Sequence, residues 1–292
     1  MQPNLRWAFA RYRATAHHLP SAKRGFPPFS AQVRNLRGVI DRYDGFILDA
    51  FGVLNIGDRA IPEALERVAQ LRKAGKRLVV MTNGASKSHT EALAKFHSWG
   101  FDFASDELIS SRDLAAKALR MRTGLWLAIG PEGASLEDLP SNLRAYDPKL
   151  LAQADGILML GSEGWTEAKQ AGLVAALSAR PRPVICANPD IVAPREEGFT
   201  WEPGHYACAL PVPVEFFGKP HGGALAAALD RLALPANRVA MVGDTLHTDV
   251  LGGRAAGCFT VLVAGHGFFA GSDPHPFIRA TGLTPDFIAD VT

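Results

Sequence analysis

The chain has 292 residues, of which 47% are hydrophobic and 21% charged, so its composition is that of an ordinary globular protein with one or two domains. The formal net charge of +2 argues against a dedicated nucleic-acid surface. No run of about 18 apolar residues occurs, so we expect no membrane span. Cys186, Cys208 and Cys258 show no CxxC spacing, which indicates unpaired core residues in a reducing cytoplasm.

Residues 1–40 form a basic N-terminal extension without a single Asp or Glu. Its basic residues are Arg6, Arg11, Arg13, Lys23, Arg24, Arg34 and Arg37. An acid-free, Arg-rich start is found in mitochondrial transit peptides. The alternative is a basic helix that packs on the core or on a partner, and we favour this interpretation. Gly25-Phe26-Pro27-Pro28 breaks the helical pattern.

Strands and helices alternate along the rest of the chain. Residues 45–51 are a continuous apolar run, typical of a buried parallel strand. Further strands are predicted at 77–81, 125–129, 156–160, 183–187, 239–242 and 259–263. Helices are predicted from Pro62 to Gly75, from an N-cap at Ser86 to about Trp99, and at 111–122, 164–179, 221–233 and 248–256. The Pro- and Gly-rich residues 194–218 read as a long linking loop. The alternation predicts an α/β protein with parallel sheets and right-handed crossovers.

Polar residues stand where several predicted strands end, which is the edge at which open α/β sheets bind ligands. Asp49 ends the first strand, Thr82 and Asn83 end the second, Asp244 follows a later strand, and Lys219 precedes a helix. A carboxylate can attack phosphorus, a hydroxyl and an amide can hold phosphoryl oxygens, and a lysine can neutralise their charge. Together these residue types predict phosphoryl transfer.

A second acidic cluster, Asp244 and Asp249, can hold a hard divalent cation. Magnesium prefers one or two carboxylates together with phosphate and water oxygens. Such a cation removes the repulsion between the Asp49 carboxylate and an anionic substrate. We therefore expect Mg²⁺ as the cofactor.

Four segments resemble, in order, the four motifs of the haloacid-dehalogenase-like (HAD) superfamily. They are Ile47-Leu48-Asp49-Ala50-Phe51-Gly52-Val53-Leu54, Thr82-Asn83, Gly218-Lys219-Pro220, and Gly243-Asp244-Thr245 with Asp249. The resemblance implies a Rossmann-like core and an aspartyl phosphate on Asp49. It implies Lys219 as the catalytic lysine, which also binds phosphate with Thr82 and Asn83. The implied metal ligands are Asp49, the backbone carbonyl of Phe51, Asp244 and Asp249.

The spacing of the motifs resembles the class IIA branch, in which an α/β cap domain is inserted between the second and third motifs. We expect the core to comprise residues 41–85 and 216–292, and the cap residues 86–215. Asn188-Pro189-Asp190 is similar to a short motif of that branch, which makes Asn188 and Asp190 candidates for a substrate loop. Related caps often mediate dimers, so the resemblance leaves a homodimer open.

Phe51 departs from the usual pattern, because most phosphatases of this superfamily carry an Asp there. That Asp protonates the leaving group, and losing a general acid costs roughly 10²–10⁴-fold in rate. The preferred interpretation is a phosphatase for a small phosphorylated metabolite, such as a sugar phosphate or a substrate with a good leaving group. A class IIA sub-branch with an aromatic residue here, similar to predicted sugar phosphatases, favours it. The alternatives are a non-catalytic phosphate-binding or regulatory relative and a 2-haloacid dehalogenase, whose halide leaves without a proton.

Other residues could supply the missing proton transfer, and histidine titrates in the right range. His221 follows the predicted lysine, His247 lies inside the acidic motif, and His266 follows the last core strand. We expect His221 or His247 to serve. Glu163, Trp165 and Asp190 of the cap are candidates for contacts with the leaving group.

Overall fold

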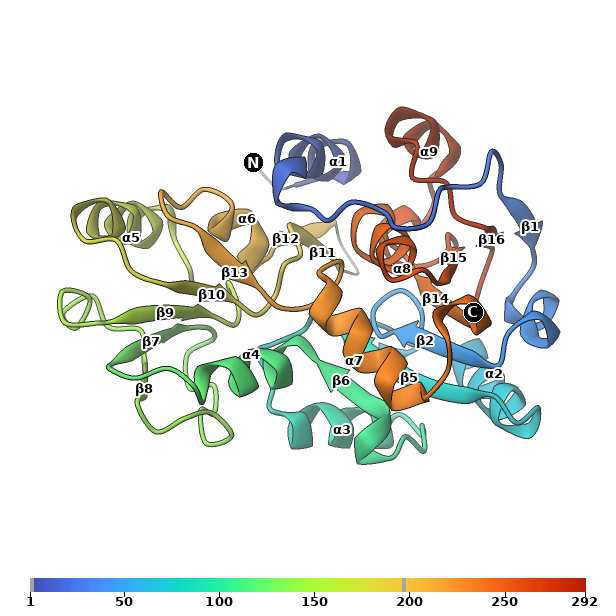
Figure 1. Ribbon diagram of the computed structural model, residues 1–292, viewed down its shortest axis with the longest axis horizontal. Helices are drawn as coiled ribbons and strands as arrows, with labels where there is room; N and C mark the ends of the chain where they lie inside the picture. The colour runs from blue at the N-terminus through green and yellow to red at the C-terminus, as the bar shows by residue number, and fades with distance from the viewer. Residues whose placement is uncertain (1–2, 196–197) are drawn as a thin grey trace.

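The computed structural model describes residues 3–195 and 198–292 as a mixed α/β protein built on two parallel sheets (Figure 1). In the described residues the larger sheet has the order β1 (Ala31–Val33), β16 (Phe287–Ala289), β15 (Phe259–Val263), β14 (Val239–Gly243), β2 (Gly45–Asp49), β5 (Arg77–Thr82), β6 (Leu108–Ser110). The smaller sheet has the order β13 (Val214–Phe216), β10 (Val184–Cys186), β9 (Gly156–Met159), β7 (Trp126–Ile129), β8 (Leu143–Ala145). The predicted fold class and strand runs are confirmed.

Helices cover both faces of the larger sheet, because alternate side chains of its strands point in opposite directions. Phe46 and Leu48 of β2 lie in the apolar cluster with α2 (Pro62–Lys73) and α3 (His89–Ser98), whereas Ile47 lies in the cluster with α7 (Gly222–Leu232). The other helices are α1 (Leu5–Ala14), α4 (Ser111–Leu119), α5 (Glu167–Ala179), α6 (Pro203–Ala207), α8 (Leu251–Ala256) and α9 (His275–Thr281). None of the helices in the described ranges is long and apolar enough to cross a membrane.

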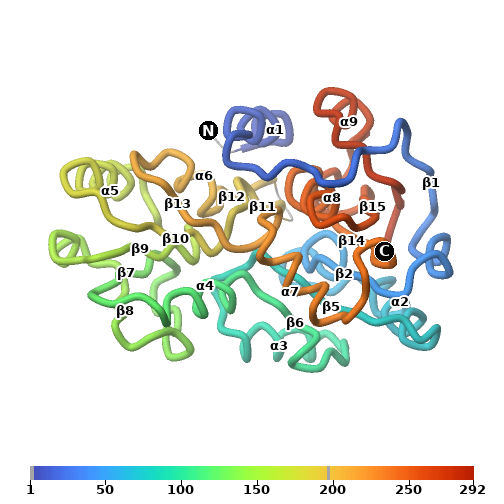
Figure 2. Tube along the Cα trace, viewed as in Figure 1, coloured from blue at the N-terminus to red at the C-terminus, as the bar shows by residue number. Residues whose placement is uncertain are grey.

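The chain leaves the larger sheet after β6, builds the smaller sheet, and returns through β13 to α7 and β14 (Figure 2). The strand β6 hydrogen-bonds to β5, although it lies inside the predicted cap range 86–215. Helix α4 lies between the sheets, with Leu114 packed on the larger one and Leu119 on the smaller one. The change of sheet thus comes after α4, later than residue 86. Three-residue β6 is too short to show a period in the sequence.

Two local predictions need correction. The helix predicted from an N-cap at Ser86 begins two residues later, because Ser88 is the N-cap and forms a capping box with Glu91. The predicted loop 194–218 holds regular structure: the hairpin β11 (Val192–Pro194) and β12 (Phe199–Trp201), then α6 and β13. Pro203 lies in the first turn of α6. Proline is favoured there because the backbone N–H groups of the first turn have no partner within the helix.

Helix α1 packs into the core. Ala8, Phe9 and Tyr12 of α1 are buried in one cluster with Ile191 and Val192 beside the β11–β12 hairpin, which lies near α1 in Figure 1. The same cluster includes residues of the larger sheet's side, namely Leu246, Val250, Leu262, Phe268, Phe269, Ile278 and Ile288. This placement agrees with the interpretation that the basic N-terminal segment is a helix packed on the core. Strand β1 of the same segment extends the larger sheet.

Candidate active site

Asp49 ends β2 at the point where the strand order of the larger sheet reverses, between β14 and β5. Such a switch point is where ligands bind in open α/β sheets. Asp244 follows β14, and Asp249 lies in the π-helix η6 (Leu246–Val250) that precedes α8. One carboxylate oxygen from each of the three Asp residues lies within 4.8 Å of the others. The predicted acidic residues are therefore brought together.

Backbone and hydroxyl donors fix the two later carboxylates. Thr245 Oγ1 and the Phe268 N–H donate to Asp244, at 2.8 and 2.7 Å. The Thr245 N–H donates to Asp249 Oδ2 at 3.1 Å. Gly52 has φ +74°, and a Cβ there would overlap the Asp244 carboxylate, so the loop after β2 needs glycine at this point.

Lys219 is the cation of the site and is only 1% exposed. Its Nζ lies 2.5 Å from Asp49 Oδ1 and 2.8 Å from Asp249 Oδ1. Burial alone would lower the pKa of Lys219, but the Asp249 and Asp49 carboxylates outweigh burial and raise it. The ammonium form of the Lys219 side chain is therefore favoured, and its ion pair holds Asp49 Oδ1 in place.

One ammonium group lies among three buried carboxyl groups, which together carry more negative charge than it offsets when all three are ionised. Burial, together with the Asp249 carboxylate, raises the pKa of Asp49 to about 7 despite the Lys219 contact. Burial and the Asp49 and Asp249 charges raise the pKa of Asp244 well above its usual value. An oxygen-only donor set with unbalanced negative charge fits a hard divalent cation. The ligand role of the Phe51 carbonyl stays a prediction.

Thr82 ends β5 and Asn83 follows it, and the two side chains differ in their hydrogen bonds. Thr82 lines the cavity, and its Oγ1 accepts the Gly84 N–H at 3.0 Å. The Asn83 amide donates to the Lys219 carbonyl and to Asp190 Oδ1, both at 2.9 Å, and its oxygen accepts the Lys219 N–H at 2.7 Å. Asn83 thus positions the lysine and Asp190, and its side chain has no amide proton left for a phosphate.

The predicted substrate loop reaches the site from the smaller sheet. Asn188 is buried, accepts the Asp190 N–H at 3.1 Å and donates to Glu202 at 3.1 Å. Asp190 is partly buried beside Asn83. Hydrogen bonds therefore hold this loop both within the smaller sheet's side, through Asn188 and Glu202, and to the end of β5, through Asn83.

Tyr12 is a residue of the site's surroundings that sequence reasoning missed. It is 2% exposed, its ring stacks on His247 at 4.6 Å and 4°, and its hydroxyl accepts the Ile191 N–H at 3.2 Å. One side chain therefore contacts both the π-helix that carries Asp249 and the residue after Asp190. Nothing near Tyr12 in the sequence signals this contact.

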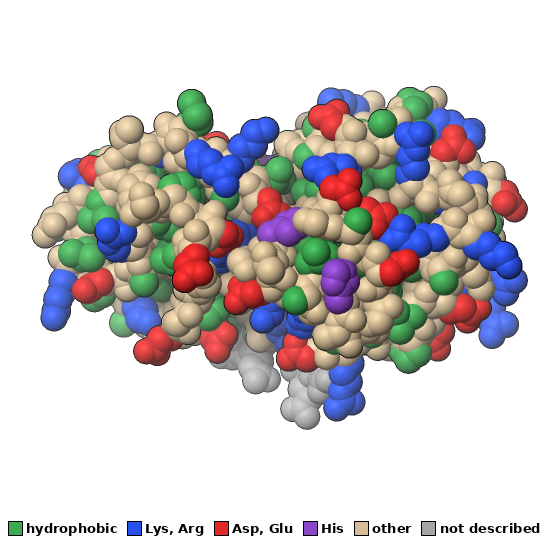
Figure 3. All heavy atoms as spheres, turned by 90° about the horizontal axis from the view of Figure 1, so that it is seen from below, with side chains coloured by type: hydrophobic (Ala, Val, Ile, Leu, Met, Phe, Trp, Pro, Cys, Tyr) green, Lys and Arg blue, Asp and Glu red, His purple; other side chains and the backbone are tan. Residues whose placement is uncertain are grey.

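A cavity of about 890 Å³ opens between the two sheets. Its lining includes the predicted residues Asp49, Phe51, Thr82, Asn83, Glu163, Trp165, Asn188, Asp190, Lys219 and Asp244. Charged side chains of both signs are scattered over the molecular face in Figure 3.

The predicted histidines lie elsewhere. Among the described residues, the cavity lining includes none of His221, His247 and His266. His221 stacks on Phe216 at 5.1 Å and 6°, and His247 is 3% exposed under Tyr12. Burial lowers the pKa of both His221 and His247 to about 4. The structure thus places both as neutral packing residues.

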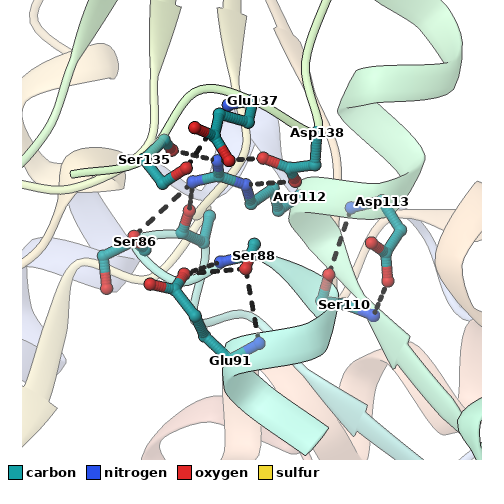
Figure 4. A network of polar contacts seen from close by, with 10 residues as sticks. Ser86, Ser88, Glu91, Ser110, Arg112, Asp113, Ser135, Glu137 and Asp138 are labelled. Atoms are coloured by element: carbon teal, nitrogen blue, oxygen red, sulfur yellow. Dashed lines mark hydrogen bonds and ion pairs between the residues drawn. The ribbon is translucent and has the colours of Figure 1, made fainter.

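A buried arginine connects the two sheets on another side of the site (Figure 4). Arg112 of α4 is fully buried and forms a two-point ion pair with Asp138, at 2.5 and 2.8 Å. It also donates to the carbonyl groups of Ala85, two residues after Asn83, and of Ser135. The loop after β7 is thereby tied to the turn after β5.

Comparison with known proteins agrees with this geometry. Residues 46–139 match the model of a haloacid dehalogenase-like hydrolase family, and residues 216–290 match a second HAD-like hydrolase model. These segments contain all four motif regions, from the Asp49 strand to Asp249.

Several similar proteins are described as phosphatases. Bovine chronophin is 29% identical over 246 residues, 78% of this chain and 83% of its own. The p-nitrophenyl phosphatase of Archaeoglobus fulgidus is 28% identical with a TM-score of 0.68, covering 85% of this chain and 96% of that one. A protein of Cytophaga hutchinsonii described as a possible sugar phosphatase is 25% identical with a TM-score of 0.79, covering 90% and 98%. On its motifs, its site and these matches, the chain belongs to the haloacid dehalogenase-like hydrolases.

Proposed function

We propose that the protein is a Mg²⁺-dependent phosphatase that acts on a small phosphorylated metabolite through an aspartyl phosphate on Asp49. The observation that carries the proposal is the meeting of Asp49, Asp244, Asp249 and Lys219 at the switch point. Phosphatases among the relatives support it, and the one described as a possible sugar phosphatase suggests a sugar phosphate as substrate. The unpaired, mostly buried cysteines are in keeping with the cytoplasm.

The residues divide the work as follows. Asp49 would attack phosphorus, with its free oxygen oriented by the Lys219 ion pair on the other. Lys219 and the Thr82 hydroxyl would bind the phosphoryl oxygens as charge moves onto them. Asp49, Asp244 and Asp249 would hold Mg²⁺, which supplies the positive charge that offsets the substrate and the carboxylates. Water then releases phosphate from Asp49.

The test measures phosphate release from phosphomonoesters, acyl phosphates and nucleotides, with Mg²⁺ and with EDTA. We expect turnover that requires the metal and disappears in Asp49→Asn. Mg²⁺-dependent binding of phosphate without turnover on the whole panel would instead favour the non-catalytic relative. Chloride release from chloroacetate without metal would favour the dehalogenase.

A further inference from the structure

Breaking a phosphate ester of an alcohol requires a proton source in the cavity. The bonding electron pair goes to the leaving oxygen, and an alkoxide is a poor leaving group unless it is protonated. Phe51 has no proton to give, and the Lys219 ammonium is stabilised by two carboxylates. Asp49, Asp244 and Asp249 are committed to attack and to the metal. The proton donor must therefore come from the rest of the cavity lining.

We propose that Asp190 is the general acid and general base of this reaction, an inference that rests on the proposed phosphatase function. It takes the place of a carboxyl group that residue 51 does not provide. Asp190 lines the same cavity as Asp49, and it comes from the smaller sheet's side, opposite the strand ends that hold the nucleophile and the metal ligands.

Asn83 fixes Asp190 relative to the catalytic lysine. Its amide nitrogen donates to Asp190 Oδ1 and to the Lys219 carbonyl, each at 2.9 Å. The structure shows no donor to Asp190 Oδ2 among the described residues, so this oxygen remains available for a substrate or a water. The backbone on both sides of the carboxyl is held, through Asn188 Oδ1 and through the Tyr12 hydroxyl.

Two other carboxylates of the lining, Asp58 and Glu202, fit the role less well. Asp58 is exposed and paired with Lys95 at 2.5 Å. Glu202 already accepts hydrogen bonds from Asn188, Arg195 and Thr200. Burial raises the pKa of Asp190 to about 7, with Glu202 and Asp249 acting in the same direction against Asn83 and Lys219. A carboxyl group with such a pKa is suited to proton transfer near neutral pH.

The proton balance closes over two steps. In the first, protonated Asp190 gives its proton to the leaving oxygen as that oxygen takes the P–O pair, and the alcohol departs. In the second, the Asp190 carboxylate takes a proton from water as the water oxygen bonds to phosphorus. The pair of the P–O bond to Asp49 returns to Asp49, and Asp190 is protonated again.

The experiment compares Asp190→Asn with the wild type, both with Mg²⁺, on ethyl, phenyl, p-nitrophenyl and acetyl phosphate. Asn keeps an oxygen that can accept from Asn83, and thermal unfolding reports whether the fold is intact. Single turnovers with enzyme in excess measure the first leaving-group release alone. We expect a loss of roughly 10²–10⁴-fold on ethyl phosphate and almost none on acetyl phosphate, whose leaving group needs no proton. Steady-state turnover of Asp190→Asn should fall on all four substrates, because each of them forms the same aspartyl phosphate, whose hydrolysis requires the activation of water by Asp190.

The matched control is Asp58→Asn, which removes an exposed carboxylate from the rim of the same cavity. We expect its single-turnover rates to match the wild type on every substrate. An equal loss on all leaving groups in Asp190→Asn, or no loss on ethyl phosphate, would refute the role of Asp190 and leave the phosphatase intact. A wild type that releases phosphate from none of the four would overturn both proposals.

Discussion

The strand ends of the larger sheet and the first 40 residues contribute to the same site in different ways. Asp49, Thr82 and Asp244 follow long apolar strands, so their positions can be read from the local sequence. Tyr12 lies in a basic helix far from any motif, yet it contacts His247 and the Ile191 backbone. The comparison teaches that candidate reacting groups can be recognised from the residues around them in the sequence. The groups that hold them in place can come from distant parts of the chain.

The largest effect should come from the strand ends. Asp49→Asn removes the proposed nucleophile and keeps its shape, so kcat should fall on the order of 10⁴-fold or more, as for other covalent nucleophiles. Phosphate release with a saturating substrate and Mg²⁺ measures this loss. Because burial raises the pKa of Asp49, a neutral Asn there should not destabilise the fold, and urea unfolding serves as the control. Full activity in Asp49→Asn would contradict the assignment of the reacting group to the strand ends of the larger sheet.

The N-terminal helix gives the next effect. Tyr12→Ala should lower the free energy of unfolding by about 3–5 kcal/mol, as for other buried aromatic residues. Tyr12→Phe keeps the ring stack and leaves the Ile191 N–H without its acceptor, which should cost about 1–3 kcal/mol. Urea unfolding of the full chain measures both.

Phe29→Ala is the matched control in the same segment, because Phe29 is 76% exposed. It should change the free energy of unfolding by less than about 0.5 kcal/mol. If Tyr12→Ala were as stable as Phe29→Ala, the packing of Tyr12 would not stabilise the protein. The N-terminal helix would then not support the site.

A metal-site test sharpens the other side of the comparison. Thr245→Val removes the hydroxyl that donates to Asp244 at 2.8 Å, so Mg²⁺ affinity should fall by roughly 10–100-fold. Titration of activity with Mg²⁺ gives the half-saturating concentration. Thr281→Val is the control, since that hydroxyl bonds the backbone of α9, and an equal Mg²⁺ response in the two variants would contradict the role of Thr245.

The smallest effect concerns His221. Its folded pKa of about 4 is below the ordinary value, so the unfolded chain binds more protons between about pH 4 and 6.5. The contribution of His221 to stability is therefore full at pH 7 and declines as the pH falls through that window. The difference in unfolding free energy between wild type and His221→Gln isolates this contribution from buried carboxylates whose pKa values are raised. A difference that stayed constant with pH would show that His221 titrates normally.

Sequence alone predicted the parts of the fold that have long, uniform signals. The apolar runs of β2, β5, β14 and β15 are five or six residues long and were placed to within two residues. The three-residue strands β6 and β16 were missed, because neither lies within a longer apolar run of the sequence. In the candidate site, the residue types alone indicated which side chains could act as a nucleophile, a cation or a metal ligand.

Contacts between distant residues were outside the reach of such reasoning. The Asn83 amide was expected to bind phosphate, but 136 residues separate it from the Lys219 backbone that it holds. His247 was expected to transfer protons, and only the position of α1 shows that Tyr12 covers its ring. The sequence lists possible donors, and the fold decides which partners they find.

The place of the smaller sheet within the chain has a consequence for synthesis on the ribosome. Strand β2 emerges early, but its neighbour β14 begins only at Val239, after the whole of the smaller sheet has been made. Local strand pairs can form as they emerge, whereas distant pairs wait for the second strand. The three carboxylates therefore meet only after Asp249 has left the ribosome, so the candidate site is incomplete on the nascent chain until then.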